Sequence, residues 1–220
     1  LSTHADAYLE WAGFLTLLGT TKTEPRDFSH YFKYSENDED FSAITTYYLQ
    51  TTNDTIDSMY ITTQALRSTE DGSRDYVYDS IVYKKFLNSY LLSSILTRYG
   101  QPEQILLSMD ITYLEEPSPN SFNIWLFYPS RGAIINYEGE AIIQNNIIKG
   151  CPSNTFVTLW LAIPGSTNLH PETLDKEIWL SSSQYYKSTV DAIGMTAEEF
   201  YNEFKETNNG CLESPMDIWQ

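Results

Sequence analysis

Apolar residues recur every three or four positions in two long segments of the chain, which is the spacing of a helix that buries one face. The clearer segment spans residues 80–99 and stops at Gly100, and the other spans residues 3–18 and stops at Gly19. Glycine directly after the last periodic residue is a common helix end, because it adopts the left-handed backbone conformation without strain. The pattern therefore predicts two helices that pack against a core.

Two shorter helical patterns follow near the C-terminus, at residues 184–193 and 196–206. In the second, Thr196 precedes Glu199 by three residues, the spacing at which a threonine hydroxyl and a glutamate carboxylate cap each other's backbone N–H groups. The tail at residues 211–219 is apolar enough to pack on the body of the protein. We therefore expect a short C-terminal helical segment followed by a docked tail.

Between the helical patterns, β-branched and aromatic residues gather in short runs that predict strands. Residues 44–51 and 56–66 flank the turn signal Thr52-Asn53-Asp54 and predict a hairpin. Residues 21–42 are polar with scattered aromatic residues and predict a connection without regular structure. Five further runs, separated by turn residues, predict an antiparallel meander and its closing strand: 105–113, 122–128, 133–137, 140–148 and 156–163.

Helix, glycine and antiparallel strands occur in the same order twice, within residues 1–70 and 76–165. This repetition predicts an α+β fold whose antiparallel sheet is built from tandem helix-plus-β-meander units. Residues 166–220 would then form a C-terminal helical extension. The 220 residues are enough for one domain, 1–220, with a single core.

The charge of the chain limits the kinds of partner that it can bind. With 30 Asp and Glu against 13 Lys and Arg, the net charge is −17 and the isoelectric point is near 4.3. Nucleic acids and anionic membrane surfaces are bound through positive charge, so this composition argues against both. No apolar run reaches the roughly 20 residues of a membrane span. We therefore expect membrane attachment only through an anchor upstream of residue 1.

The chain has two cysteines, Cys151 beside Pro152 and Cys211 after Gly210. Two thiols beside turn residues, in a chain rich in Ser, Thr, Asn and Tyr, predict one structural disulfide and an oxidising, extracytoplasmic location. The alternative is a pair of buried free cysteines, because cysteine is often buried. No CxxC pair is present and no histidine is near either cysteine in sequence, so we predict no redox or metal site.

Two resemblances rest on short stretches of sequence. The junction Tyr99-Gly100-Gln101-Pro102 resembles the helix-to-strand junction of BamE/SmpA-type outer-membrane lipoproteins and of the β-lactamase-inhibitor-protein fold. Residues 96–219 are similar to uncharacterised predicted lipoproteins of filamentous green non-sulfur bacteria (Chloroflexi), through Trp125-Leu126-Phe127-Tyr128-Pro129 and Cys211-Leu212-Glu213-Ser214-Pro215. The second resemblance implies export, an upstream lipid anchor and the disulfide, and it carries no established activity.

Catalytic motifs are missing from the sequence. The G-x-S-x-G, H-E-x-x-H and P-loop patterns do not occur, and the acidic run at residues 36–40 lacks the order of an EF-hand loop. Glu115-Glu116 and Glu198-Glu199 are adjacent acids, whereas glycosidase carboxylates must face each other across the scissile bond. We therefore expect a non-catalytic protein without a metal ion or cofactor.

Aromatic residues are abundant, with 17 Tyr, 10 Phe and 5 Trp. Tyr and Trp combine apolar area with a polar group, so a sheet face that exposes them can bind a partner. Trp125 and Tyr128 are the candidates for such a face, and both suit the core equally well. The sequence thus predicts an extracytoplasmic, lipid-anchored protein-interaction module with an unidentified protein partner. The alternative is a structural subunit of a cell-surface assembly or envelope complex, which would self-associate.

Overall fold

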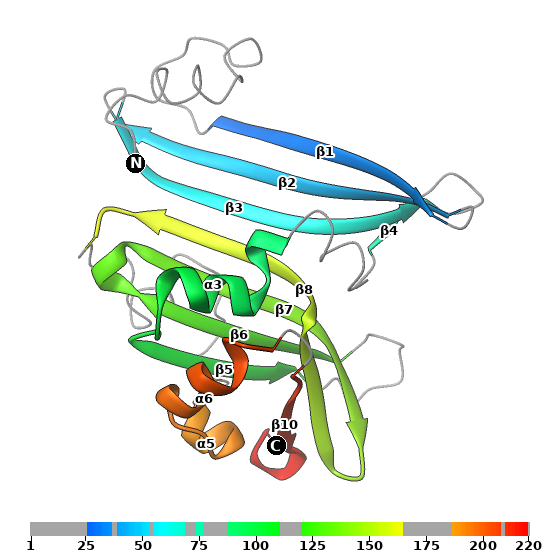
Figure 1. The fold of residues 1–220 in the computed structure, drawn as a ribbon, viewed down its shortest axis with the longest axis vertical. Helices are drawn as coiled ribbons and strands as arrows, with labels where there is room; N and C mark the ends of the chain where they lie inside the picture. The colour runs from blue at the N-terminus through cyan, green and yellow to red at the C-terminus, as the bar shows by residue number, and fades with distance from the viewer. Residues whose placement is uncertain are drawn as a thin grey trace.

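The computed structural model describes residues 26–36, 39–52, 55–68, 74–76, 88–110, 120–164, 186–207 and 210–219. Within these ranges the strands are β1 (Arg26–Glu36), β2 (Glu39–Thr52), β3 (Thr55–Ser68), β4 (Arg74–Tyr76), β5 (Gln104–Asp110), β6 (Ser121–Tyr128), β7 (Ala133–Gln144), β8 (Ile147–Ala162), β9 (Lys187–Ser188) and β10 (Leu212–Pro215). They form one ten-stranded antiparallel sheet in the order β1-β2-β3-β8-β7-β6-β5-β9, with β4 beside β3 and β10 beside β8 (Figure 1). The sheet is therefore the body of the described protein.

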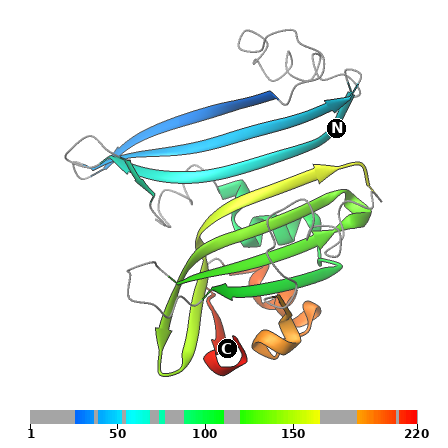
Figure 2. The same ribbon diagram turned by 180° about the vertical axis from the view of Figure 1, so that it is seen from behind.

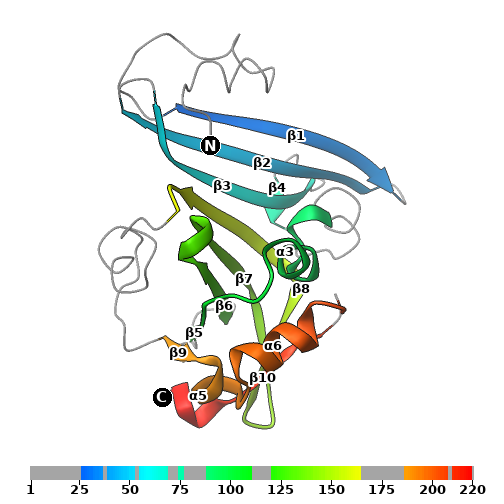
Figure 3. The ribbon, with the colours of Figure 1, turned by 60° about the vertical axis from the view of Figure 1, so that its left-hand side comes forward.

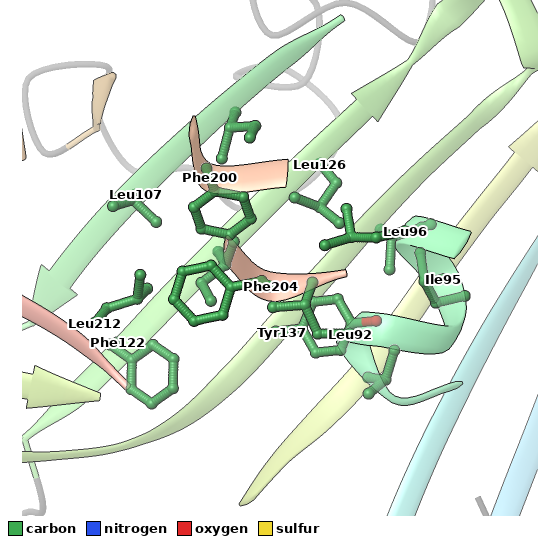
Figure 4. Packing of buried hydrophobic residues seen from close by; sticks show 14 of the residues in the cluster. Leu92, Ile95, Leu96, Leu107, Phe122, Leu126, Tyr137, Phe200, Phe204 and Leu212 are labelled. Carbon is green, nitrogen blue, oxygen red and sulfur yellow. The ribbon is translucent and has the colours of Figure 1, made fainter. Parts of the chain in front are cut away.

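The three α-helices within the described ranges lie on one face of this sheet, which we call the helix face (Figure 3). They are α3 (Leu92–Tyr99), α5 (Thr189–Ile193) and α6 (Ala197–Phe204), and three 3-10 turns accompany them, η2 (Asn88–Tyr90), η3 (Pro129–Arg131) and η6 (Met216–Trp219). The main core fills the space between these helices and β5 to β8. Figure 4 shows Leu96, Phe200 and Phe204 from the helices packed over Leu126 and Tyr137 from the strands.

Helix α3 buries the stripe that predicted it. Leu92, Ile95 and Leu96 point into the core and are at most 4% exposed, since residues three and four apart share one side of a helix. The helix ends at Gly100, whose φ of 75° suits glycine and whose N–H donates to the carbonyl of Leu96 at 2.8 Å. The predicted end is confirmed, but the α-helix begins only at Leu92. Residues 88–90, predicted as part of it, form the 3-10 turn η2, and residues 80–87 lie outside the described residues.

The capping box that begins α6 is also confirmed. The hydroxyl of Thr196 accepts the N–H of Glu199 at 3.2 Å, and the Glu199 carboxylate accepts the N–H of Thr196 at 2.8 Å. The backbone hydrogen bond from Thr196 lowers the pKa of Glu199, because it stabilises the carboxylate form. Phe200 and Phe204 follow on the buried side, with ring centroids 4.7 Å apart. The cap thus places two aromatic rings in the core.

The predicted fold class is wrong. The described residues are mostly antiparallel strands, and the α+β fold of tandem helix-plus-β-meander units is not present. The reason is a long-range pairing: β3 lies beside β8, with Tyr60 opposite Trp160, so the early hairpin extends the later meander. Both halves of the proposed pseudo-repeat, residues 1–70 and 76–165, therefore supply strands to one sheet. Residue spacing along the chain does not specify which distant strands pair.

Several predicted elements change their bounds. The hairpin at residues 44–66 is confirmed as β2 and β3, but the connection predicted at residues 21–42 contains β1, which pairs with β2 along its whole length. The strands predicted at 133–137 and 140–148 are wrong as separate elements, because β7 continues through the glycine between them. The helix predicted at residues 3–18 lies outside the described residues.

The turn between β7 and β8 falls at Asn145 and Asn146, with φ values of 51° and 62°. Two successive left-handed residues form the type I′ turn that suits a two-residue hairpin, and asparagine tolerates this conformation better than most residues. The hairpin extends beyond β6, and β10 pairs with its β8 strand (Figure 1). Its tip carries the exposed residues Ile142, Ile143 and Ile147.

Candidate functional site

Aromatic residues from distant segments meet on the sheet face opposite the helices, which Figure 2 shows toward the reader. Tyr60 of β3 and Trp160 of β8 occupy opposite positions in neighbouring strands, and their ring centroids lie 5.2 Å apart. The Trp160 ring stacks on Trp125 of β6 at 5.2 Å, across the intervening strand β7. Tyr186 meets the other side of Trp125 edge-on at 6.4 Å. We call these four residues the aromatic row.

The aromatic row rests on a small apolar cluster of its own. Trp125, Phe127 and Ile134 are 5%, 1% and 0% exposed, respectively. The partly buried residues packed around them are Leu106, Trp160, Ala162 and Tyr186. The centre of the sheet therefore has packed side chains on both faces. The helices cover those on one face, and the cluster around Trp125 forms the other. Tyr60, Trp160 and Tyr186 keep part of their surface exposed, so three of the four rings in the row are accessible, whereas Trp125 is buried.

Uncharged polar residues lie beside the aromatic row on the same face of the sheet. Thr158 of β8 lies opposite Thr62 of β3 on one side and opposite Asn136 of β7 on the other. The side-chain amide of Asn136 donates to the side-chain oxygen Oδ1 of Asn123 at 3.2 Å. Glu138 stands at the margin, where partial burial raises the pKa of its carboxyl group. A patch with aromatic residues at its centre and charge only at its margin has the composition of a protein interface core.

The indole N–H of Trp125 is buried, and among the described residues it has no hydrogen-bond acceptor. A buried donor without a partner destabilises the folded state by roughly 1–3 kcal/mol, so such groups are rare in native proteins. Trp125 therefore places a buried polar group at the centre of the aromatic row.

The two candidate binding-face residues do not share a face. Trp125 belongs to the aromatic row, whereas Tyr128 is 1% exposed in the core beneath the helices, because residues three positions apart on a strand point to opposite sides. The Tyr128 hydroxyl donates to the carbonyl of Gly100 at 3.0 Å, and burial raises the pKa of this phenol. Both residues are buried, which is the second of the two alternatives that the sequence left open.

Sequence reasoning missed Tyr60 and Trp160, although a signal was available. On β3 and β8 these aromatic residues alternate with buried apolar residues, Met59 and Ile61 around the first and Leu159 beside the second. A strand whose two alternating sets are both apolar or aromatic is covered on both faces. That pattern indicates a second packed face, but the pairing that brings Tyr60 to Trp160 is visible only in the structure.

The predicted disulfide is confirmed between Cys151 and Cys211, whose Cα atoms lie 4.2 Å apart. It joins β8 to the residue before β10, where Leu212 takes its place opposite Gly150. Beyond the bridge the Trp219 indole N–H donates to the Ser214 hydroxyl at 2.7 Å, which agrees with the expected docking of the tail. The bridge therefore holds the last described strand on the sheet.

The described part of the chain holds no group of three His, Cys, Asp or Glu side chains that suits a metal ion. None of the helices found in those ranges is both long and apolar enough to cross a bilayer. No family model and no curated protein matches the chain. The resemblance to BamE/SmpA-type and Chloroflexi lipoproteins therefore stays a prediction, and the aromatic row is a candidate site on its geometry alone.

Proposed function

We propose that this protein is an extracytoplasmic, non-catalytic module that binds a protein partner through the aromatic row. The observation that carries the proposal is the continuous series of ring contacts from Tyr60 through Trp160 and Trp125 to Tyr186, assembled from four separate segments on the face without helices. Stability alone does not require this arrangement, since the main core lies on the other face. Tyrosine and tryptophan are also the residues most often responsible for affinity at protein interfaces.

The chemistry of the face favours a protein over a polyanion or a charged surface as the partner. Thr62, Thr158 and Asn136 surround the aromatic row with uncharged groups that donate and accept hydrogen bonds. The net charge of the chain is −17, but the residues named in and around the row are uncharged apart from Glu138 at the margin, which limits repulsion of an acidic or neutral partner there. A protein surface can offer apolar side chains that pack on the aromatic row and backbone polar groups that hydrogen-bond with the uncharged residues around it.

The disulfide supports the extracytoplasmic part of the proposal, because such bridges persist in oxidising compartments. The lipid anchor is a further part of the proposal, and it would attach the module to an envelope membrane upstream of residue 1. Partner binding on a tethered module needs one accessible face, and the aromatic row provides it. In this proposal the protein is a membrane-anchored binding module that catalyses no reaction.

Site-specific photo-cross-linking in the native cell envelope tests this function. A benzoylphenylalanine placed at Thr158, beside the row, is expected to capture one defined protein, whereas the same group at the 55%-exposed Val190 on α5 is not. The captured protein, once purified, should bind the wild-type module and lose at least tenfold in affinity for Trp160→Ser, as expected for an interface anchor. Val190→Ser is the matched control and should bind normally.

Two results would overturn the proposal. One is the same set of adducts from both cross-linker positions, which would mean nonspecific contact. The other is unchanged affinity of the captured protein for Trp160→Ser, provided that far-UV circular dichroism and the intact disulfide report a folded variant. Either result would remove the aromatic row as the binding surface and leave the face as an unusual packing arrangement.

A different observation favours the alternative function, a structural subunit of a cell-surface assembly. Strand β1 is the outermost strand of the sheet, and such an edge is a template for pairing with another chain (Figure 1). A subunit of this kind would form large assemblies in solution. Its solution mass therefore separates it from the binding module.

A further inference from the structure

We propose that two copies of the chain associate edge to edge through β1, antiparallel about a two-fold axis at Tyr31, so that two ten-stranded sheets become one. The association uses the edge of the sheet and not the aromatic row. It therefore does not rest on the proposed partner binding. The occupant of the β1 edge is a second copy of the same strand.

The outer edge of β1 is long and unbroken. The strand has 11 residues, and its pairing with β2 runs without a register shift from Arg26 opposite Leu49 to Glu36 opposite Glu39. Within the described ranges no strand pairs with its other side. Among the features that protect edge strands, β1 has charged residues, but it is not short and contains neither a proline nor a bulge. The proposal takes this long edge as the place where a second copy pairs.

The sequence of β1 is complementary to itself in the antiparallel sense. In the register centred on Tyr31, all 11 residues pair, and Arg26 takes the position opposite Glu36 of the partner subunit at both ends. Phe28 falls opposite Tyr34 of the partner subunit, an aromatic cross-strand pair of the kind that stabilises sheets. No two like charges take opposite positions. The two-fold operation creates each of these pairs twice.

Other ways of joining two β1 strands lose this complementarity. Parallel pairing in register sets Arg26 beside Arg26 and Glu36 beside Glu36, which is unfavourable at both ends. An antiparallel register centred on His30 brings Asp27 opposite Lys33, but it leaves the last two residues unpaired and loses both arginine–glutamate pairs. The register centred on Tyr31 is the one that uses the whole strand.

Local charge also favours this edge over the rest of the surface. The strand holds Arg26 and Lys33 against Asp27 and Glu36, so its formal charge is balanced, whereas the whole chain carries −17. Two copies repel each other over most of their surface at low ionic strength. The eleven residues that pair add no net charge of their own to this repulsion.

Charge reversal tests the register by sedimentation equilibrium of the purified chain. Wild type should form a dimer of twice the 25.3 kDa chain mass. Arg26→Glu and Glu36→Arg should each weaken the dimer at least tenfold, because each change turns two attractive pairs into two repulsive ones. The double variant Arg26→Glu/Glu36→Arg should restore the wild-type dimer. Asp27→Lys/Lys33→Asp is the matched control, and neither of its single changes should approach the effect of Arg26→Glu.

Cysteine cross-linking gives a second readout that does not depend on charge. At the two-fold axis Tyr31→Cys would face its own copy and should form a disulfide-linked dimer on mild oxidation, whereas Ser29→Cys would face Lys33 of the partner subunit and should not. A monomeric wild type at all concentrations, or a double variant that stays monomeric, would overturn the proposal. Trp160→Ser should leave the dimer unchanged, and the charge variants should leave partner binding unchanged, so the two proposals fail separately.

Discussion

The hydroxyl of Tyr137 donates a 2.9 Å hydrogen bond to the backbone carbonyl of Tyr90, which ties the middle of the sheet to the turn that precedes α3. Tyr137 is fully buried, and burial raises the pKa of its phenol well above the ordinary value. On the adjacent strand, Tyr128 makes the equivalent bond to Gly100 after the same helix. Two buried phenols thus hold both ends of α3 on the sheet.

Tyr137→Phe removes this hydrogen bond while keeping the ring in the core. The carbonyl of Tyr90 would lose its phenol partner, and we expect the free energy of unfolding to fall by about 1–3 kcal/mol. Urea unfolding followed by tryptophan fluorescence measures the change. Tyr201→Phe, at a half-buried position on α6, is the control and should cost less than about 0.5 kcal/mol. Equal costs for the two variants would contradict a structural role for the Tyr137 bond.

The disulfide should supply a large share of the stability. Its cysteines are 60 residues apart in sequence, and a bridge of that span stabilises a protein by about 4 kcal/mol in the chain-entropy model. Cys151→Ser/Cys211→Ser should therefore lower the free energy of unfolding by about that amount in urea titrations. Reduction with dithiothreitol should weaken the wild type and leave the double variant unchanged. An effect of the reductant on the double variant would mean that it acts elsewhere.

Gly150 lies against the ring of Phe122, and an added Cβ would come within 2.5 Å of that ring. We expect Gly150→Ala to destabilise the protein by about 1–3 kcal/mol through overpacking. The cost should be smaller in a Phe122→Leu background, with a coupling of at least about 0.5 kcal/mol in a double-mutant cycle. Gly194→Ala is the contrasting control, because the Gly194 penalty comes from a φ of 71° with nothing near its Cβ. Its cost should not depend on Phe122.

The raised pKa of Glu138 makes stability depend on pH. The folded state holds this proton more tightly than the unfolded chain does, so the contribution is greatest at low pH and is lost as pH rises through the folded pKa. Glu138→Gln should therefore raise the urea midpoint slightly at pH 7, and the gain should disappear below about pH 4. Glu140→Gln controls for the loss of one negative charge. An identical gain for both variants would remove any special role for Glu138.

Local sequence patterns correctly predicted the structural features that depend on residues close together in the chain. The Thr196–Glu199 cap, the end of α3 at Gly100 and the β2–β3 hairpin each depend on residues close in sequence, and all are confirmed. Strand β1 was missed although Phe28, Phe32 and Tyr34 share one alternating set of positions, the period-2 pattern of a strand. The polar residues between them resemble those of a connection, and the pairing with β2 decides that this segment is a strand. The predicted bounds of β7 failed because a glycine inside a strand resembles a turn.

Two cysteines allow one intramolecular pairing, so the disulfide partners follow from the sequence, as does the strand-rich middle of the chain. Three features depend instead on the assembled fold: β3 joins β8, all three described helices lie on the same face, and Tyr60 packs against Trp160. The β3–β8 pairing and the Tyr60–Trp160 contact join residues about a hundred positions apart. Their pairing follows from the packing of the whole sheet, and no local propensity encodes it.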